Sequence, residues 1–167
     1  MSPRPDDDWN QQARHETPTE RLDRNWADIL QELRVTQTGV QFLTGFLLTL
    51  PFQSRFTALS GTERTVYLVT VSASVLATGF LVMPVSLHRL LFRRHARAEL
   101  VRVAHRSALT GLALLAVAVV GVVDIVFAAI VGAGAAWVAA GVTALVLAAL
   151  WLVVPLGLRR RLPAETL

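Results

Sequence analysis

The stretch RVTQTGVQFLTGFLLTLPFQ at residues 34–53 decides the fold, because it is long enough to span a membrane as a helix yet carries many amide and hydroxyl groups. At 100° per residue, its polar and apolar side chains fall mostly on opposite halves of a helix. The polar half, the polar stripe, holds Arg34, Gln37, Thr38, Gln41, Thr44, Gly45, Thr49 and Gln53, and the apolar half holds Val40, Leu43, Phe46, Leu47 and Leu50. A polar group without a partner in hydrocarbon costs several kcal/mol. The polar stripe is therefore expected to face other helices or a wet cavity.

The composition indicates a single-domain integral membrane protein. Of 167 residues, 53% are hydrophobic and 17% are charged, and the apolar residues gather in runs of about 20. The 16 basic residues are all arginines that lie beside these runs, so the net charge of +4 indicates membrane topology rather than nucleic-acid binding. The chain has no cysteine, which excludes disulfides and thiolate chemistry. Because it also has no nucleotide-binding loop, protease or hydrolase motif, we expect neither an enzyme with catalytic residues nor a cofactor.

The hydrophobic pattern predicts an all-α integral membrane fold, with an amphipathic N-terminal helix before a four-helix transmembrane bundle. The expected segments are a disordered polar tail at 1–16, an amphipathic cytoplasmic helix at 17–34, spans at about 35–53, 66–87, 107–130 and 136–157, and a basic C-terminal tail at 158–167. Pro84 lies inside the second span and implies a kink that neighbouring helices can tolerate.

Residues 17–34 predict an amphipathic helix with a defined start, where Thr17, Pro18 and Glu20 suit the N-cap, first helical and capping-box positions. One face carries the apolar residues Leu22, Trp26, Ile29, Leu30 and Leu33. This face either lies on the membrane surface or docks on protein, which is the cytoplasmic end of the bundle, a second subunit or another partner. Protein docking is favoured, because helices that lie on membranes are usually basic and this helix is not.

The distribution of arginines predicts that both termini are cytoplasmic. The tail and first helix hold five arginines, the linker at 54–65 two, the linker at 88–106 six, the turn at 132–134 none and the C-terminal tail three. With four spans, the groups of five, six and three lie on one side, which the positive-inside rule assigns to the cytoplasm. We therefore expect a multi-pass protein of the plasma membrane.

The six arginines of the second linker are expected to contact lipid headgroups: Arg89, Arg93, Arg94, Arg97, Arg102 and Arg106. His88, His95 and His105 lie among them, but their spacing is not that of metal ligands, and the neighbouring positive charge opposes cation binding. No metal site is therefore predicted.

Asp124 is the one ionisable residue deep inside an apolar run. Counted from Ser107, it lies about 25 Å along its helix, in the outer third of the bilayer. An intramembrane carboxylate often marks a cation or proton site. The alternative is a structural role, in which Asp124 is neutral or is paired with Arg55, Arg64 or Gln53 near the outer face. Both roles are kept as alternatives.

The polar stripe supports two hypotheses of function. Together with Asp124, its amide and hydroxyl oxygens could line an oligomeric pathway for protons or a small cation. They could instead hydrogen-bond across helices, at about 0.6 kcal/mol each, within a structural or partner-binding module. Because helix packing is the commoner use, the non-enzymatic module is the preferred hypothesis, and transport by a homo-oligomer is the alternative.

The stretches ETPTERLDRNWADILQELRVTQTGVQFLTGFLLTLPFQ at 16–53 and PVSLHR at 84–89, followed by FRR at 92–94, carry a family resemblance. They resemble the two signatures of a family of small actinobacterial membrane proteins with four spans. The resemblance covers most of the chain and is loose after residue 107. It implies the four-span fold but no activity, since the family has no known function and its members have at times carried an automatic sodium:proton antiporter label. Four spans are few for a monomeric antiporter, so that label adds little to the transport hypothesis.

Overall fold

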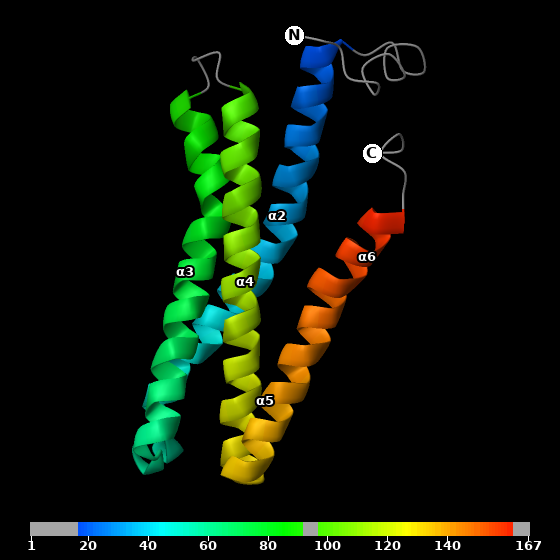
Figure 1. Ribbon diagram of the computed structural model, residues 1–167. Coiled ribbons are helices and arrows are strands. Elements are labelled where there is room, and N and C mark those ends of the chain that lie inside the picture. The colour runs from blue at the N-terminus through cyan, green and yellow to red at the C-terminus, as the bar shows by residue number, and fades with distance from the viewer. Residues whose placement is uncertain (1–16, 92–96, 162–167) are drawn as a thin grey trace.

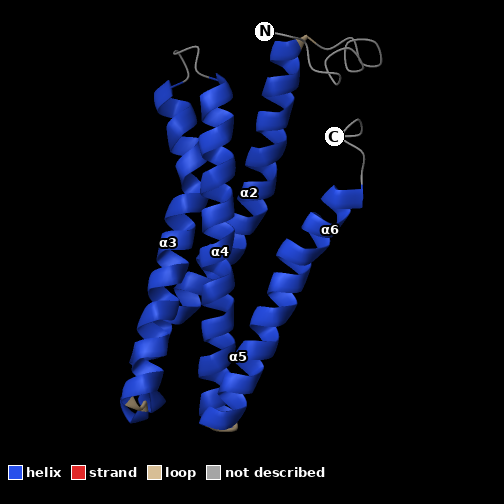
Figure 2. Ribbon diagram, in the orientation of Figure 1, coloured by secondary structure: helices blue, strands red, loops and turns tan. Residues whose placement is uncertain are grey.

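The structure is a computed structural model that describes residues 17–91 and 97–161. Within these ranges the elements are helices, and no strand is present (Figure 2). The elements in chain order are α2 (Pro18–Thr49), the 3₁₀ helices η1 (Leu50–Phe52) and η2 (Ser54–Ala58), α3 (Gly61–Leu91), α4 (Arg97–Ile130), α5 (Ala133–Ala148), the π-helical turn η3 (Ala149–Val153) and α6 (Val154–Arg161). The all-α prediction is confirmed for this part of the chain. The polar tail expected at 1–16 and the last residues of the expected C-terminal tail, 162–167, lie outside the described residues.

The helices run alternately up and down in an open bundle (Figure 1). α3 and α4 lie side by side and antiparallel, α2 crosses behind them, and the α5–α6 unit diverges from α4 toward the end of α6. The start of α2, the end of α3, the start of α4 and the end of α6 lie toward one end of the bundle. The described parts of the three arginine-rich segments therefore lie toward the same end.

α2 is one continuous helix of 32 residues, so the amphipathic segment at 17–34 continues without a break into the predicted first span, a point that the sequence left open. It begins with the predicted capping box: the Thr17 backbone N–H donates to Glu20 Oε2 at 2.8 Å, and the Glu20 N–H donates to Thr17 Oγ1 at 3.3 Å. The bond from the Thr17 backbone, followed by that from its hydroxyl, holds the pKa of the Glu20 carboxyl below its usual range. The helix gives way to η1 near Pro51, which has no N–H to continue the hydrogen-bond ladder.

The helices are longer than the apolar runs that predicted them. α3 begins at Gly61, inside the predicted 54–65 linker, with a second capping box in which the Ser60 N–H donates to Glu63 Oε2 at 2.7 Å. α3 then continues to Leu91 and α4 begins at Arg97, so most of the predicted 88–106 linker is helical. The expected C-terminal tail is likewise helical as far as Arg161. Hydropathy marks where side chains become polar, whereas backbone hydrogen bonding continues past that point.

Small residues bring α3 and α4 close together. A Cβ at Gly111 would lie 2.8 Å from Leu81 Cγ, and a Cβ at Gly121 would lie 1.9 Å from Thr70 Oγ1. The buried residues of both helices recur at steps of three, four or seven, as in a coiled coil, and they include Tyr67, Thr70, Ser74, Ala77, Leu81 and Pro84 of α3 and Ala104, Ser107, Gly111, Ala118 and Gly121 of α4. This spacing keeps one face of each helix against the other along most of its length.

α2 packs on α3 through leucine and valine at seven-residue steps. Leu33, Val40 and Leu47 are buried, and the first two form a hydrophobic cluster with Ala77 and Leu81 of α3. Leu33, which the sequence placed on the docking face of 17–34, thus belongs to the core of the bundle. The core therefore extends into the segment predicted to lie outside the membrane.

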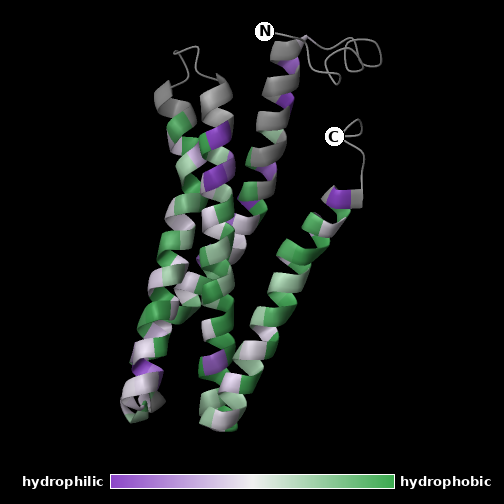
Figure 3. Ribbon diagram, in the orientation of Figure 1, coloured by the Kyte–Doolittle hydropathy of each residue, from purple (hydrophilic) through white to green (hydrophobic). Residues whose placement is uncertain are grey.

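The α5–α6 unit is the most exposed part of the described bundle. Gly132 makes the tight turn before α5 with a φ of 121°, a conformation that L side chains rarely adopt. The π turn η3 ends two residues before Pro155, whose ring clashes with the preceding turn of a regular α-helix. Only 6% of the most apolar window within Ala133–Leu158 is buried, and Figure 3 shows hydrophobic residues along the helix. Such a surface fits contact with lipid.

Three helical segments are long and apolar enough to cross a membrane: Gly61–Leu87, Arg102–Ile130 and Ala133–Leu158. They correspond to the spans predicted at 66–87, 107–130 and 136–157. α2 does not reach the same hydropathy, because its glutamines, threonines and charged residues such as Arg34 lower the average. Three apolar helices therefore support the prediction of a membrane protein.

Candidate functional site

The structure divides the polar stripe between two faces of α2. Gln37 and Thr44 are half-buried against α3, where Gln37 Nε2 donates to the Leu81 carbonyl at 2.6 Å and the hydroxyls of Thr44 and Ser74 lie 2.5 Å apart. The remaining members are exposed: Arg34, Thr38, Gln41, Gly45, Thr49 and Gln53. The expected contact with other helices is thus present at Gln37 and Thr44. The packing face follows the 3.5-residue repeat that α3 imposes, so it cuts across the two halves expected from 100° spacing.

The exposed threonines of α2 satisfy their hydroxyls within the helix, whereas Gln41 does not satisfy its amide. Thr38 donates to the Arg34 carbonyl at 3.1 Å, and Thr49 donates to the Phe46 carbonyl at 2.7 Å. The Gln41 amide makes no hydrogen bond with any residue that the structure describes. Gln41 is therefore an exposed polar group of α2 without a hydrogen-bond partner among the described residues.

A node of three helices forms around Pro84 of α3. Proline has no N–H, so the Phe80 carbonyl one turn earlier loses its helical donor. Ser107 of α4 supplies a replacement, since its hydroxyl donates to the Phe80 carbonyl at 2.5 Å. The neighbouring carbonyl, that of Leu81, accepts from Gln37 of α2. The tolerance for a kink that the sequence predicted at Pro84 thus rests on side chains from two other helices.

Asp124 is buried in α4, with 6% of its surface exposed. It lies one turn after Gly121, the residue that meets Thr70, so the antiparallel register places it at the level of Tyr67 on α3. Its Oδ1 has no hydrogen-bond partner among the described residues. Of the predicted partners, Gln53 and Arg64 are exposed, and the Arg55 side chain lies outside the described residues. Asp124 is therefore enclosed by packing rather than held by an ion pair that the structure describes.

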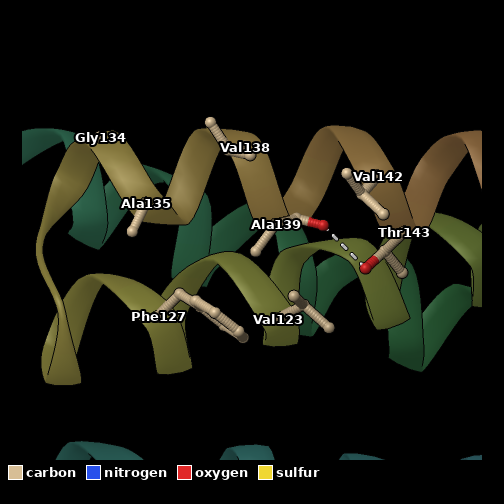
Figure 4. Close-up of a pocket in the computed structure, with 8 residues that line it drawn as sticks. All are labelled: Val123, Phe127, Gly134, Ala135, Val138, Ala139, Val142 and Thr143. Carbon is tan, nitrogen blue, oxygen red and sulfur yellow. Dashed lines mark hydrogen bonds between the residues drawn. The ribbon is translucent and has the colours of Figure 1, made fainter.

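Two apolar grooves lie between α4 and the α5–α6 unit. The first groove, close to the α4–α5 turn, is lined by Val123, Phe127, Gly134, Ala135, Val138, Ala139, Val142 and Thr143 (Figure 4). Its one hydroxyl, that of Thr143, donates to the Ala139 carbonyl at 2.8 Å. The second groove is lined by Leu109, Leu112, Ala113, Ala116, Val117, Val120, Ala144, Leu147, Ala148, Trp151 and Leu152. Neither groove includes Asp124 or the polar stripe, so neither connects them.

The other predicted site residues fall partly outside the described side chains. On the docking face of 17–34, Leu33 is buried and Leu30 is half-buried, while the side chains of Leu22, Trp26 and Ile29 lie outside the described residues. Among the arginines expected at lipid headgroups, Arg102 and Arg106 are exposed on α4. The Arg89 and Arg97 side chains and the whole of Arg93 and Arg94 lie outside the described residues. Within the described ranges, no cluster of three or more His, Cys, Asp or Glu residues could hold a metal ion.

The sequence analysis missed the hydroxyl groups that pair with α2 and with Pro84. Ser74 and Ser107 are buried, and Tyr67 Oη donates to the Leu47 carbonyl at 3.0 Å. Tyr67 also stacks edge-on with Phe56, with ring centroids 4.9 Å apart. The available signal was their spacing, since Tyr67 and Ser74 stand seven residues apart within one predicted span.

The sequence from residue 15 to residue 155 matches a family of unknown function, DUF6328. No curated protein and no solved structure matches the chain. The matched range includes α2, the node at Pro84 and Asp124, and both stretches that carried the resemblance lie wholly within it. The chain therefore belongs to the DUF6328 family of unknown function.

Proposed function

We propose that the chain is a four-span integral membrane protein that acts as a structural or partner-binding module, with α2 as its binding helix and both termini in the cytoplasm. The observation that carries this proposal is Gln41, an amide that faces outward halfway along the predicted first span without a described partner. In hydrocarbon, an amide on one helix is stabilised by a hydrogen bond from a neighbouring helix. The partner is a second copy of the chain or another membrane protein.

The exposed surface of α2 supports its placement in the membrane, which brings the number of spans to four. Phe42 is 77% exposed, Phe46 is 62% exposed, and Phe52 in η1 is 88% exposed. A water-soluble helix rarely presents such a surface, whereas a lipid-facing helix needs one. The groups that lower its mean hydropathy include Gln37 and Thr44, whose side chains bond to α3. With α2 as a span, the arginine-rich segments lie together on the side that the positive-inside rule assigns to the cytoplasm.

Replacement of Gln41 by leucine tests the partner-binding surface. The fraction of associated protein is measured by light scattering after purification in mild detergent, or by single-molecule photobleaching in liposomes. We expect Gln41→Leu to weaken association about threefold for each intermolecular hydrogen bond lost, since such a bond contributes about 0.6 kcal/mol. The matched control is Gln53→Leu, which removes the same amide near the membrane edge, where water can replace the bond. Equal association of Gln41→Leu and the parent would refute the role of this surface.

The N-terminal half of α2 has its own test as a docking helix. Trp26→Ala combined with Leu30→Ala should release a co-purifying protein or dissociate the oligomer while the spans still insert into the membrane. Gln31→Ala, a change at an exposed position of the same segment, is the control and should leave both unchanged. If the double variant retains its partners and its oligomeric state, residues 17–34 do not dock.

Ion transport is the second candidate function, and the unpaired Oδ1 of buried Asp124 favours it. Its weakness is geometric, because Asp124 lies in the tightly packed α3–α4 pair whereas the exposed part of the polar stripe lies on the outer face of α2. Proton and sodium flux into liposomes is compared for the parent, Asp124→Asn and Gln41→Leu. Equal flux in all three excludes these residues as a pathway, and flux that disappears in Asp124→Asn makes the chain a transporter.

A further inference from the structure

The second groove has the length and chemistry of one bilayer leaflet. Its α4 wall extends from Leu109 to Val120, which is about 17 Å along a helix, and half of a bilayer's hydrocarbon core is about 15 Å thick. Every lining side chain is apolar, and Trp151 and Leu152 close the opposite wall. The groove has a volume of about 440 Å³ and lies where the α5–α6 unit diverges from α4 (Figure 1).

Arginines stand just beyond this groove on both of its walls. On α4, Arg106 is exposed. Leu109 follows it by three residues and Ala113 follows Leu109 by four, so all three lie on one face of the helix. On the other wall, Arg160 is exposed on α6, eight residues after Leu152. Both arginines lie toward the end of the bundle at which α6 ends. A molecule with its apolar part in the groove would therefore have its polar end toward the end of the bundle that carries these positive charges.

We propose that this groove, together with Arg106 and Arg160, binds one anionic phospholipid of the surrounding bilayer. The acyl chains occupy the apolar groove, and the anionic headgroup lies at the end of the bundle that carries Arg106 and Arg160, where positive charge attracts it. A second copy of the chain fits less well, because a copy in the same membrane orientation would bring its own arginines to the same level. A zwitterionic lipid fills the groove equally but adds a positive headgroup beside the arginines. This inference rests on the membrane orientation proposed above.

Native mass spectrometry of the delipidated full-length protein tests this site, with phosphatidylglycerol and phosphatidylcholine of identical acyl chains as probes. We expect the parent to bind phosphatidylglycerol roughly 10- to 30-fold more tightly, from the attraction of two arginines near an anionic headgroup. Arg106→Gln combined with Arg160→Gln should reduce this preference to near parity. Ala113→Trp, which fills the groove from an exposed position, should abolish the binding of both lipids.

Arg34→Gln is the matched control, because Arg34 is an exposed arginine of α2 that does not line the groove. It should retain the parent's preference, and circular dichroism of every variant should show the parent's helicity. The proposal is overturned by equal affinity of the parent for the two lipids, by a loss in Arg34→Gln as large as in the double variant, or by unchanged binding in Ala113→Trp. A dimer that Ala113→Trp dissociates would place a second copy in the groove and also overturn it. Flotation of the parent with phosphatidylcholine vesicles tests membrane insertion separately, so failure there refutes the proposed function itself.

Discussion

Gly121 is the position at which a single added methyl group should disturb the fold most clearly. A Cβ there would lie 1.9 Å from Thr70 Oγ1, 3.0 Å from Thr70 Cβ and 3.1 Å from Thr70 Cγ2. Thr70 cannot rotate away cheaply, because it is 1% exposed and its hydroxyl donates to the Val66 carbonyl at 2.7 Å. Gly121→Ala therefore forces α3 and α4 apart.

The expected cost follows from two opposing effects. Extra volume in a packed interior costs about 1–3 kcal/mol. Alanine is favoured over glycine in a helix by up to about 1 kcal/mol, which offsets part of that cost. We expect Gly121→Ala to lower the free energy of unfolding by about 1–2 kcal/mol, measured by titration of the protein from mild detergent into a denaturing detergent.

Two further variants separate the steric effect from a general effect of alanine. Gly79→Ala is the matched control in α3, because a Cβ there meets nothing within 4 Å. It should leave stability unchanged or raise it slightly. Thr70→Ala in the Gly121→Ala background removes the two outer atoms of the clash and should restore part of the lost stability. If Gly121→Ala is as stable as Gly79→Ala, the close approach of α3 and α4 at this position is wrong.

Two other parts of the fold give sharp predictions. Ser107→Ala and Gln37→Leu should each lower the free energy of unfolding by about 1 kcal/mol. Ser107→Ala should cost less in a Pro84→Ala background, because the restored backbone N–H can bond to the Phe80 carbonyl. A double-mutant cycle in detergent measures this coupling. The first turn of α2 should lose protection from amide hydrogen exchange as the pH falls through the lowered pKa of Glu20, because a carboxyl with a depressed folded-state pKa stabilises the helix only while ionised. Glu20→Gln, whose side chain cannot ionise, should remove that pH dependence, and an unchanged pH dependence in this variant would contradict the capping role.

The sequence predicted features that depend on near neighbours. The Thr17–Glu20 capping box is a local pattern, because both partners lie within one turn of a helix, and the structure confirms it. The pattern Ser60-Gly-Thr-Glu63 carries the same signal, but it falls in the linker expected at 54–65, where Ser60-Gly61 is typical of a turn. The three most apolar spans also followed from composition alone, since hydropathy is a property of each residue rather than of its partner.

The packing face of α2 was not predictable in the same way, because it depends on what α3 offers. A 100° projection separated Gln37 and Thr44 from Val40 and Leu47, yet all four face α3. Gln37 turns inward because the Leu81 carbonyl accepts its amide, and Thr44 does so because Ser74 presents a hydroxyl. Such a bond joins residues that are 44 or 30 positions apart, and no periodicity within α2 contains that information.

Most of the buried polar side chains that suggested a pathway through the membrane form hydrogen bonds to α3. Gln37 and Thr44 bond from α2 and Ser107 bonds from α4, so these side chains hold helices together rather than line a continuous file of oxygen atoms. Gln41 and Asp124 lie on different surfaces, Gln41 on the outer face of α2 and Asp124 in the α3–α4 pair. Their variants should therefore act independently, with Gln41→Leu changing association and Asp124→Asn leaving association at the parent's value. A Gln41→Leu, Asp124→Asn double variant whose flux and association are the simple sum of the single variants would support a module in which the two surfaces are separate. Strong coupling between them would instead indicate that oligomerisation brings Asp124 and the polar stripe together. That arrangement would remove the geometric objection to the transport hypothesis.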